Sequence, residues 1–488
     1  MKLREVMAGI EGLSFLGPQN VVVAGIRYDS RRVKPGDLFA AVKGQAHDGA
    51  DFVLDAREKG AGSFLLEREI GGLKGSSIVV SDDIRRALAL ASKNFYGDPS
   101  SRLKVVGITG TNGKTTTAYL VHGILENAGV DAGLVGTVQY LVGGEVISAS
   151  RTTPEAPDLA AMMTDMADSG STACIIEVSS HALTLKRVTG VRMEVAVFTN
   201  LTADHLDFHE DMEDYFAAKV SLFEESEVAH CLINYDDPFG RRLIEKAKSK
   251  TLLFGMEKGE IRPDGKVELG DWGSRCSLNT PWGKVDVDSP LPGLFNVSNI
   301  MAAVGVCGLL GLDADSISEG ICQVHRVPGR FEKIDRGQPY KALVDYAHTP
   351  DALDNLLKNV RELAQERVVL IFGCGGDRDK TKRPIMGEIA ERLADIIFVT
   401  SDNPRTEDPE KIIDDIFNGL TVGNPAVRRV SDRREAIRLG VDEAESGDVL
   451  VLAGKGHENY QIVGERTLPF SDADELAEAI RKSGESEL

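Results

Sequence analysis

The sequence predicts an α/β protein of three domains, in which mostly parallel sheets are covered by helices. Three observations support this fold class. Short β-branched, apolar runs alternate with helical periodicity along most of the 488 residues, which is typical of parallel sheets. The chain is longer than one hydrophobic core usually organises. Breaks rich in glycine and proline near residues 98 and 329 place the predicted domains at 1–98, 99–329 and 330–488.

The N-terminal domain combines short strands and turns with helices. The patterns predict a strand over 21–26, a turn into a second strand over 34–42, and helices over 51–59 and 82–96, the last with alanine and leucine at helical spacing. Polar clusters at 29–31 and 43–49 fall at strand ends, where ligands are often bound. Taken alone, such clusters are more often plain turns.

Residues 105–117 organise the rest of the chain, because they predict a strand (105–109), a glycine-rich loop and a helix (116–128). Glycines turn backbone N–H groups onto an anion, and a helix N-terminus adds partial positive charge. Lys114 is placed to reach the β- and γ-phosphates and the Thr115 hydroxyl to meet Mg²⁺. Ile108 stands where the strict P-loop pattern has glycine, so the loop is a variant. The predicted nucleoside triphosphate site comprises Gly110, Thr111, Asn112, Gly113, Lys114, Thr115 and Thr116.

The remainder of the middle domain continues the alternation. Strands are predicted at 134–138, 173–178, 195–200 and 230–234, helices at 156–168, 212–225 and 296–310, and a hairpin at 272–287. Glu177 ends a strand, which puts a carboxylate, a hard ligand suited to Mg²⁺, at the rim of the sheet. His181, His205 and His209 cluster in two loops but lack a matched set of zinc ligands. Lys219 lies in an apolar helix, where a half-buried lysine that reaches solvent is the plainer interpretation.

The C-terminal domain is a further α/β unit. Strands are predicted at 342–345, 367–372, 395–400 and 448–452, and helices near 350–363, 384–393, 409–419 and 432–443. Polar runs at 373–383, 401–405 and 453–458 follow three of these strands. Because ligands collect at the carboxyl ends of parallel strands, these runs are expected to share one rim. Arginines there suit the capture of carboxylate or phosphate.

The bulk properties exclude several classes of partner. The net charge of −20 argues against a nucleic-acid or membrane-surface partner, and anionic substrates must therefore be captured by local basic groups. No run of about 18 apolar residues is present, as a membrane span would need. The six cysteines form no metal-ligand spacing and no signal peptide is seen, so we expect a reduced, cytoplasmic protein.

Several motifs together resemble the Mur ligase family across the whole chain. They are Thr-Gly-Thr-Asn-Gly-Lys-Thr-Thr (109–116), Glu-Val-Ser-Ser-His (177–181), the run 200–209 and Gly-x-Phe-Asn-x-x-Asn (293–299). Three further motifs, at 344–350, 373–379 and 402–405, are similar to members that add the third residue of the cell-wall peptide. The resemblance implies a central P-loop mononucleotide-binding domain, flanked by a small N-terminal domain for a UDP-sugar and a Rossmann-like C-terminal domain for an amino acid.

The resemblance also implies a reaction. ATP phosphorylates the D-glutamate side-chain carboxylate of UDP-N-acetylmuramoyl-L-alanyl-D-glutamate, and the amine of an amino acid then attacks the acyl phosphate. The implied catalytic residues are Lys114, Glu177, His205 and Lys219, and the implied Mg²⁺ ligands are Thr115, Glu177, His205 and a CO₂-derived carbamate on Lys219. A carbamate would explain a lysine in an apolar helix, because it turns a cation into an anionic oxygen ligand.

The remaining site residues follow from the same resemblance. Asn299, Arg330 and Asp345 correspond to positions that hold adenine and ribose. Those for the UDP-sugar-peptide are Ser30, Gln45, Ala46, His47, Thr152, Thr153, Ser179 and Arg187. Leu185 and Arg151 depart from the glutamine and asparagine of some members.

The amino acid implied is meso-diaminopimelate, through Arg383, Asp402, Asn403, Pro404, Arg405, Gly454 and Glu458. Arg405 with Arg383 is expected to pair with its second carboxylate. Asp402, Glu458 and the Gly454 carbonyl are expected to meet its ammonium. A site built around such a polar partner rejects a substrate that lacks it by about 10⁴-fold.

Three alternatives stay open. The same ligase could add L-lysine, a folylpolyglutamate-synthetase-like ligase shares the nucleotide loop and the three-domain plan, and a non-catalytic nucleotide-binding scaffold would need only the loop. The expected partners are small molecules, with no nucleic acid, no membrane insertion and a monomeric chain.

Overall fold

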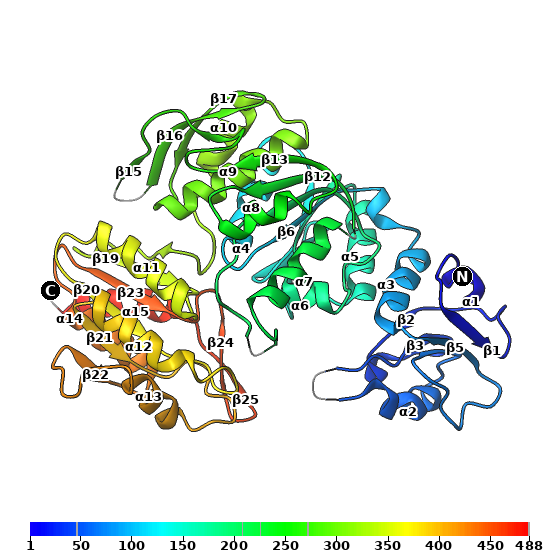
Figure 1. The fold of residues 1–488 in the computed structure, drawn as a ribbon. Helices are drawn as coiled ribbons and strands as arrows, with labels where there is room; N and C mark the ends of the chain where they lie inside the picture. The colour runs from blue at the N-terminus through cyan, green and yellow to red at the C-terminus, as the bar shows by residue number, and fades with distance from the viewer. Residues whose placement is uncertain (45–46, 207, 225, 271–272, 487–488) are drawn as a thin grey trace.

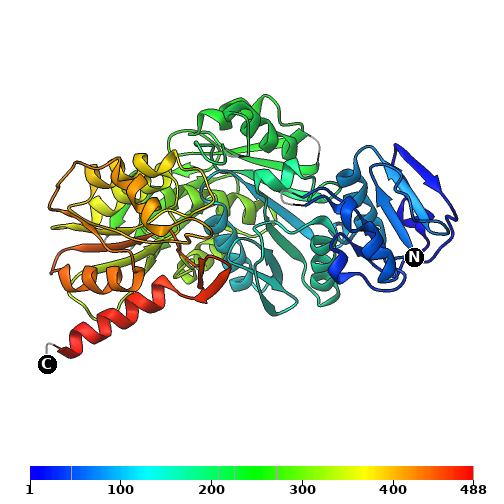
Figure 2. The same cartoon turned by 90° about the horizontal axis from the view of Figure 1, so that it is seen from below.

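The computed structural model describes residues 1–44, 47–206, 208–224, 226–270 and 273–486. Each of three units is built on its own main sheet. The middle unit lies between the other two, and both views show the N-terminal and C-terminal units on opposite sides of it (Figures 1 and 2). The boundaries predicted at 98 and 329 fall between these sheets, although the domain limits themselves stay predictions. Among the described helices, none has the length and apolar character needed to cross a membrane.

The N-terminal unit is a five-stranded sheet of order β1-β5-β4-β3-β2, in which only β1 is antiparallel to its neighbour. Its elements are β1 (Leu13–Leu16), β2 (Ile26–Arg27), β3 (Leu38–Ala40), β4 (Ser63–Leu66), β5 (Ser77–Ser81), α1 (Leu3–Val6), α2 (Val53–Glu58) and α3 (Ile84–Phe95). The strand predicted at 21–26 is mostly wrong, since β2 begins at Ile26. Residues 21–23 pair instead with the first residues of the chain, through the Leu3 N–H to the Val21 carbonyl and the Val23 N–H to the Met1 carbonyl.

The middle unit holds an eight-stranded sheet of order β13-β12-β11-β6-β10-β7-β8-β9. Its strands are β6 (Lys104–Thr109), β7 (Ala132–Val135), β8 (Gln139–Val142), β9 (Glu145–Ser148), β10 (Ala173–Glu177), β11 (Arg192–Phe198), β12 (Glu227–Asn234) and β13 (Lys250–Phe254). All neighbouring pairs are parallel except β7–β8 and β8–β9, so the predicted mostly parallel sheet is confirmed. The antiparallel extension was not predicted.

Helices cover both faces of this sheet. They are α4 (Lys114–Asn127), α5 (Ala156–Asp168), α6 (Ser180–Thr184), α7 (Met212–Glu224), α8 (Pro238–Ile244), α9 (Leu294–Leu309) and α10 (Ala314–Gln323). The helix predicted at 156–168 is confirmed with both limits. A small sheet adds β14 (Arg262–Pro263), β15 (Glu268–Gly270), β16 (Gly273–Thr280) and β17 (Gly283–Ser289). The antiparallel pair β16–β17 confirms the predicted hairpin, apart from residue 272, which lies outside the described residues.

The C-terminal unit has a six-stranded sheet of order β18-β19-β23-β20-β21-β22. Its elements are β18 (Glu332–Lys333), β19 (Lys341–Asp345), β20 (Val368–Phe372), β21 (Ile396–Val399), β22 (Val427–Arg429), β23 (Val449–Ala453), the hairpin β24 (Tyr460–Val463) and β25 (Arg466–Pro469), α11 (Pro350–Leu363), α12 (Lys382–Leu393), α13 (Pro409–Phe417), α14 (Arg433–Glu443) and α15 (Asp472–Ser486). Strands β23, β20 and β21 are parallel neighbours. The expectation that the loops after them share one rim is therefore confirmed.

The departure at position 108 has a structural reason. Ile108 is fully buried near the end of β6, in the same apolar cluster as Val106 of its own strand and Ile175 and Val197 of the neighbouring strands. A glycine there would leave that space unfilled. Position 108 therefore belongs to the core of the sheet, and the phosphate loop proper begins at Gly110.

Candidate active site

A single cleft of about 2200 Å³ is lined by residues of all three units. Most of the predicted site residues line it. They are Ser30, His47, Thr111, Asn112, Gly113, Lys114, Thr115, Thr116, Thr152, Thr153, Ser179, Arg187, His205, Asn299, Arg330, Asp345, Asp402, Asn403, Arg405, Gly454 and Glu458. Segments up to several hundred residues apart in the sequence are thus brought to one cavity.

Five of the predicted site residues that the structure describes do not line the cleft, and two more, Gln45 and Ala46, lie outside the described residues. The five sit behind the surface of the cleft: Gly110, Glu177, Lys219, Arg383 and Pro404. Of these, Glu177, Lys219 and Arg383 are ionisable residues that are almost fully buried, so their hydrogen-bond and ion-pair partners determine their role.

The phosphate loop is held in a conformation that requires glycine. Gly113 has φ +85°, and a Cβ there would lie 2.3 Å from Asn299 Oδ1, so α9 closes against the loop. Lys114 Nζ donates to the carbonyls of Gly110 (2.9 Å) and Thr111 (2.8 Å). Burial lowers the pKa of Lys114, opposed by the charge of Glu177. The lysine is thus folded back on its own loop, at the place where phosphate oxygens bind in loops of this kind.

Glu177 joins the phosphate loop to the β7 side of the sheet. Its carboxylate accepts hydrogen bonds from the Thr115 hydroxyl, the Thr137 N–H and the Thr137 hydroxyl, each at 2.9 Å. The described residues contain no cluster of three or more His, Cys, Asp or Glu side chains arranged for a metal ion. One buried carboxylate beside a threonine hydroxyl nevertheless fits Mg²⁺, which is commonly held by one or two carboxylates, waters and substrate phosphates.

Lys219 of α7 is 1% exposed and points at the phosphate loop. Its Nζ donates to the Gly110 carbonyl at 3.0 Å and lies 4.5 Å from the centre of the Tyr215 ring. Burial, reinforced by the charge of Lys114, holds the pKa of Lys219 well below its usual value. The predicted half-buried lysine that reaches solvent is therefore wrong. The environment favours a neutral amine with an unshared electron pair.

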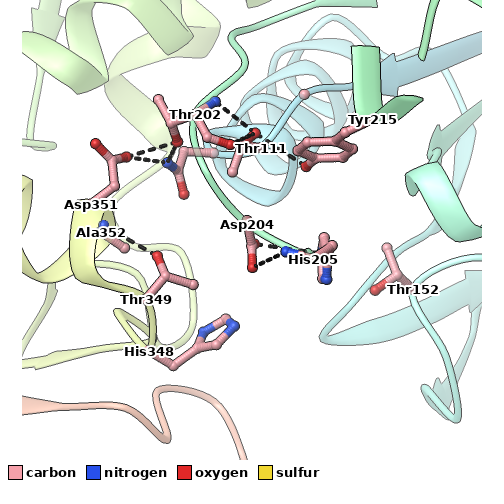
Figure 3. A network of polar contacts seen from close by, with 12 residues as sticks. Thr111, Thr152, Thr202, Asp204, His205, Tyr215, His348, Thr349, Asp351 and Ala352 are labelled. Carbon is pink, nitrogen blue, oxygen red and sulfur yellow. Dashed lines mark hydrogen bonds and ion pairs between the residues drawn. The ribbon is translucent and has the colours of Figure 1, made fainter. Parts of the chain in front are cut away.

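His205 lies on the loop after β11 with φ +55°, an unusual value for a residue with a side chain. Its N–H donates to Asp204 Oδ1 at 2.8 Å, and its Nε2 is 3.5 Å from Asp204 Oδ2 (Figure 3). Burial lowers the pKa of His205 to about 4, so the ring is neutral near pH 7. The His181 ring meets it edge-on at 4.9 Å, whereas His209 is buried with Nδ1 at 2.9 Å from Asp214.

Arg330 connects the C-terminal unit to the phosphate loop. Its guanidinium donates to the Thr115 hydroxyl at 3.2 Å and stacks 4.5 Å from the centre of the Tyr346 ring. Asp345, at the end of β19, accepts the N–H groups of Phe331 (2.7 Å) and Ala347 (2.8 Å). These contacts hold Arg330 and Asp345, two of the three residues predicted to bind adenine and ribose, at the junction of the middle and C-terminal units.

A cluster of arginines faces the cleft between the N-terminal and middle units. Glu155 is bonded by Arg187 (2.8 Å) and Arg151 (2.9 Å) and lies 3.5 Å from Arg85. All four side chains line the cleft, and three cations around one anion leave it locally positive in an acidic protein. The sequence singled out Arg187 but missed Arg85 and Glu155. Nothing in their local pattern distinguishes them from surface residues of a helix.

The C-terminal rim presents charges of both signs. Arg405, with φ +53°, donates from its guanidinium to the Gly376 carbonyl at 2.8 Å, and its N–H bonds the Ile462 carbonyl at the hairpin β24–β25. Glu458 accepts from Asn403 Nδ2 (2.8 Å) and from the fully buried Lys455 (2.9 Å). Burial raises the pKa of Glu458. Lys455 was not predicted, because its contact with Asn403 joins two loops that are 52 positions apart in the sequence.

Arg383 lies beneath the C-terminal rim and does not face the cleft. It was expected to face the amino acid, but its side chain is fully buried at the start of α12 and does not line the cleft. Its guanidinium pairs with Glu407 (2.9 Å) and Asp415 (2.8 Å) and donates to the Gly375 carbonyl (3.3 Å). Two carboxylates already neutralise it. Its place is beneath the loop that carries Arg405, as a support.

Comparisons with known proteins agree with this architecture. Family models match over residues 22–96 (Mur ligase family, catalytic domain), 108–307 (Mur ligase middle domain) and 329–456 (Mur ligase, glutamate ligase domain). The chain is 44% identical to the UDP-N-acetylmuramoyl-L-alanyl-D-glutamate–2,6-diaminopimelate ligase of Geobacter metallireducens, over 99% of both chains. It is 43% identical to the enzyme of the same name from Syntrophomonas wolfei, again over 99% of both.

Solved structures give the same picture. A structure of a UDP-N-acetylmuramoyl-L-alanyl-D-glutamate–2,6-diaminopimelate ligase matches with a TM-score of 0.70 and 31% identity over 99% of both chains. Folylpolyglutamate synthase of Mycobacterium tuberculosis, at 20% identity and a TM-score of 0.63, covers 75% of this chain and 91% of its own, so it shares the fold. Because three family models cover most of the sequence and relatives above 40% identity span nearly all of it, the chain belongs to the Mur ligase family.

Proposed function

We propose that the protein is an ATP-dependent ligase that adds meso-2,6-diaminopimelate to UDP-N-acetylmuramoyl-L-alanyl-D-glutamate through an acyl phosphate. The observation that carries the proposal is the single cleft. This cleft brings together the phosphate loop, the positive cluster between the N-terminal and middle units, and the C-terminal rim, which carries charges of both signs. The names of the full-length relatives support the same reaction. All three faces come from one chain, which supports a monomer, and diffusible substrates fit a cytoplasmic location.

The phosphoryl step falls to the middle unit. Lys114 would exchange the carbonyls of Gly110 and Thr111 for oxygens of the β- and γ-phosphates, which costs little because the lysine already points there. Mg²⁺, when bound beside Thr115 and Glu177, would neutralise charge on the phosphates during transfer. His205 is neutral and keeps a ring nitrogen able to accept or ligate.

Lys219 is proposed to carry a carbamate. Its neutral amine would attack the carbon of CO₂, so that the N–C bond forms as one C=O π bond breaks and its electron pair moves onto oxygen. The proton lost from the nitrogen passes to water, which leaves a carbamate anion. The depressed pKa of Lys219 supports this, because the protonated amine has no electron pair to donate. The test is ¹³C NMR of protein supplied with ¹³C-bicarbonate. A carbamate signal is expected in the parent protein and lost in Lys219→Ala; its absence from the parent would contradict the proposal.

Nucleotide and sugar binding are assigned to opposite sides of the phosphate loop. Asn299, Arg330 and Asp345 are proposed to hold adenine and ribose, supported by their positions at the junction of the middle and C-terminal units. The UDP-sugar-peptide is assigned to Ser30, Gln45, Ala46, His47, Thr152, Thr153, Ser179 and Arg187. The positive cluster around Glu155 supports an anionic substrate on this side.

The amino acid is assigned to the C-terminal rim. Arg405 is proposed to pair with the distal carboxylate of diaminopimelate, and Asp402, Glu458 and the Gly454 carbonyl with its distal ammonium. Asn403 and Pro404 shape the loop, and Arg383 supports it from below. The opposite charges on one rim support a zwitterionic end group, which diaminopimelate has and L-lysine lacks.

The deciding experiment measures phosphate release from ATP with the UDP-sugar-dipeptide and either diaminopimelate or L-lysine. Turnover with diaminopimelate and little with lysine is expected. Turnover with lysine would support the proposed ligase activity but contradict the assignment of the C-terminal rim to diaminopimelate. If neither amino acid gave phosphate release, a ligase for another substrate would be favoured, and a folate-dependent assay would then test it.

A further inference from the structure

A second contact joins the C-terminal unit to the phosphate loop at the start of α11 (Figure 3). Asp351 Oδ2 accepts hydrogen bonds from Asn112 Nδ2 at 3.2 Å and from the Thr202 hydroxyl at 2.8 Å. Asn112 belongs to the phosphate loop, and Thr202 follows β11. One carboxylate oxygen of the C-terminal unit therefore meets two donors of the middle unit.

Both donors are fixed within the middle unit. The Asn112 N–H donates to Asn200 Oδ1 at 2.9 Å. The Thr202 N–H donates to the Thr111 hydroxyl at 3.0 Å, and that hydroxyl lies 3.1 Å from the hydroxyl of Tyr215. The donors thus stand on a connected framework that includes the phosphate loop, and they define where Asp351 must lie.

Asp351 is equally fixed within the C-terminal unit. The Thr349 hydroxyl accepts the Ala352 N–H at 3.3 Å as the N-cap of α11, so Asp351 stands in the first turn, where the helix dipole favours a carboxylate. Just before this cap, the His348 carbonyl accepts from Lys382 Nζ at 2.8 Å. Lys382 begins α12, directly after a rim loop of the cleft, so a shift of Asp351 relative to the phosphate loop shifts the rim as well.

We propose that Asp351 is a positioning residue for amide formation: by holding α11 on Asn112 and Thr202, it sets the distance between the amino acid on the C-terminal rim and the phosphorylated carboxylate on the middle unit. This inference rests on the proposed function. An attacking amine must come within about 3–3.5 Å of its target carbon, and misplacement by about 1 Å can cost on the order of 100-fold in rate. Asp351 itself forms and breaks no covalent bond.

The energetic scale of the contact is substantial. Loss of one hydrogen bond to a charged group typically lowers the equilibrium constant for forming a contact by about tenfold to a hundredfold. Asp351→Ala removes both bonds at once, whereas Asp351→Asn keeps one acceptor oxygen and removes the charge. Thr202→Val removes one donor from the opposite side and leaves Asn112 in place.

The test combines kinetics with two measurements that need no turnover. Asp351→Ala is expected to raise the KM for diaminopimelate or lower kcat by about tenfold or more, and to change the KM for ATP less. In the nucleotide-free protein, it should increase the radius of gyration in solution scattering. It should also speed amide hydrogen exchange in peptides that cover 110–114. Asp351→Asn should fall between parent and Ala.

A matched control lies one turn along the same helix. Asp354 pairs with Lys358 and Arg392, both within the C-terminal unit, so Asp354→Ala should leave exchange at 110–114 and the KM for diaminopimelate unchanged. Effects of Asp351→Ala and Thr202→Val should be non-additive, because each removes the same contact.

Additive effects, an unchanged phosphate loop in Asp351→Ala, or equal changes in Asp354→Ala would overturn the inference. If the parent protein turned over no amino acid, the proposed function would fail. Scattering and exchange would still decide whether Asp351 holds the two units together.

Discussion

Arg405→Ala offers the sharpest test of the rim. The Arg405 guanidinium lies half-buried at the cleft, held by the Gly376 carbonyl at 2.8 Å. A bidentate pair with a carboxylate contributes two charged hydrogen bonds, each worth about 1.5–3 kcal/mol. Because the site is partly solvated and one N–H already serves Gly376, we take the lower limit of about 3 kcal/mol for the pair, which is about a hundredfold in kcat/KM.

The assay compares kcat/KM for diaminopimelate, kcat/KM for L-lysine and the KM for ATP. Arg405→Ala should lower the first about a hundredfold and change the other two by no more than about twofold. Arg434→Ala is the control, since this exposed arginine pairs with Glu475 away from the cleft. Equal losses for both amino acids, or a matching rise in the KM for ATP, would refute the pairing of Arg405 with the distal carboxylate.

Three further predictions follow from contacts in the structure. Gly113→Ala should raise the KM for ATP at least about tenfold, because φ +85° strains any residue with a side chain and the new Cβ would clash with Asn299. The control is Gly129→Ala, which has a similar φ of +72° but open space around its Cβ, so it should lower the stability by about 1 kcal/mol and leave the KM for ATP unchanged. Equal effects of the two variants on this KM would contradict the role of the contact with Asn299. Arg383→Met should lower the free energy of unfolding by about 2 kcal/mol in urea, because it removes the charged hydrogen bonds between a fully buried guanidinium and the partly exposed Glu407 and Asp415. A loss below about 1 kcal/mol would show that these pairs contribute little to stability. Hydrogen bonding to Arg383 lowers the pKa of Glu407 to about 2. The difference in unfolding free energy between the parent and Glu407→Gln should therefore be largest above pH 4.5 and should shrink as the pH falls toward 2. A difference that does not change with pH would show that the charge of Glu407 is not its cause.

The sequence by itself determined the local elements and the order in which they occur. Strand, loop and helix at the phosphate site follow from β-branched residues, glycines and helical spacing within about a dozen positions. The shared rim followed from a rule about parallel sheets, and the sheet order bears it out. The strand prediction failed where the segment was short: four of residues 21–26 are β-branched, yet Val21 and Val23 bond to residues at the start of the chain, and only Ile26 belongs to a strand of the sheet.

Tertiary structure alone decided how the charged residues are used. Lys219 and Gly110 are 109 positions apart, and Asn112 and Asp351 are 239 apart, so no local pattern could reveal either contact. Arg383 shows the same limit, because an arginine in a polar loop can face a ligand or turn inward to Glu407 with no change in the local sequence. Burial decides the charge state of a lysine and the partner of an arginine, and burial is a property of the whole packed chain.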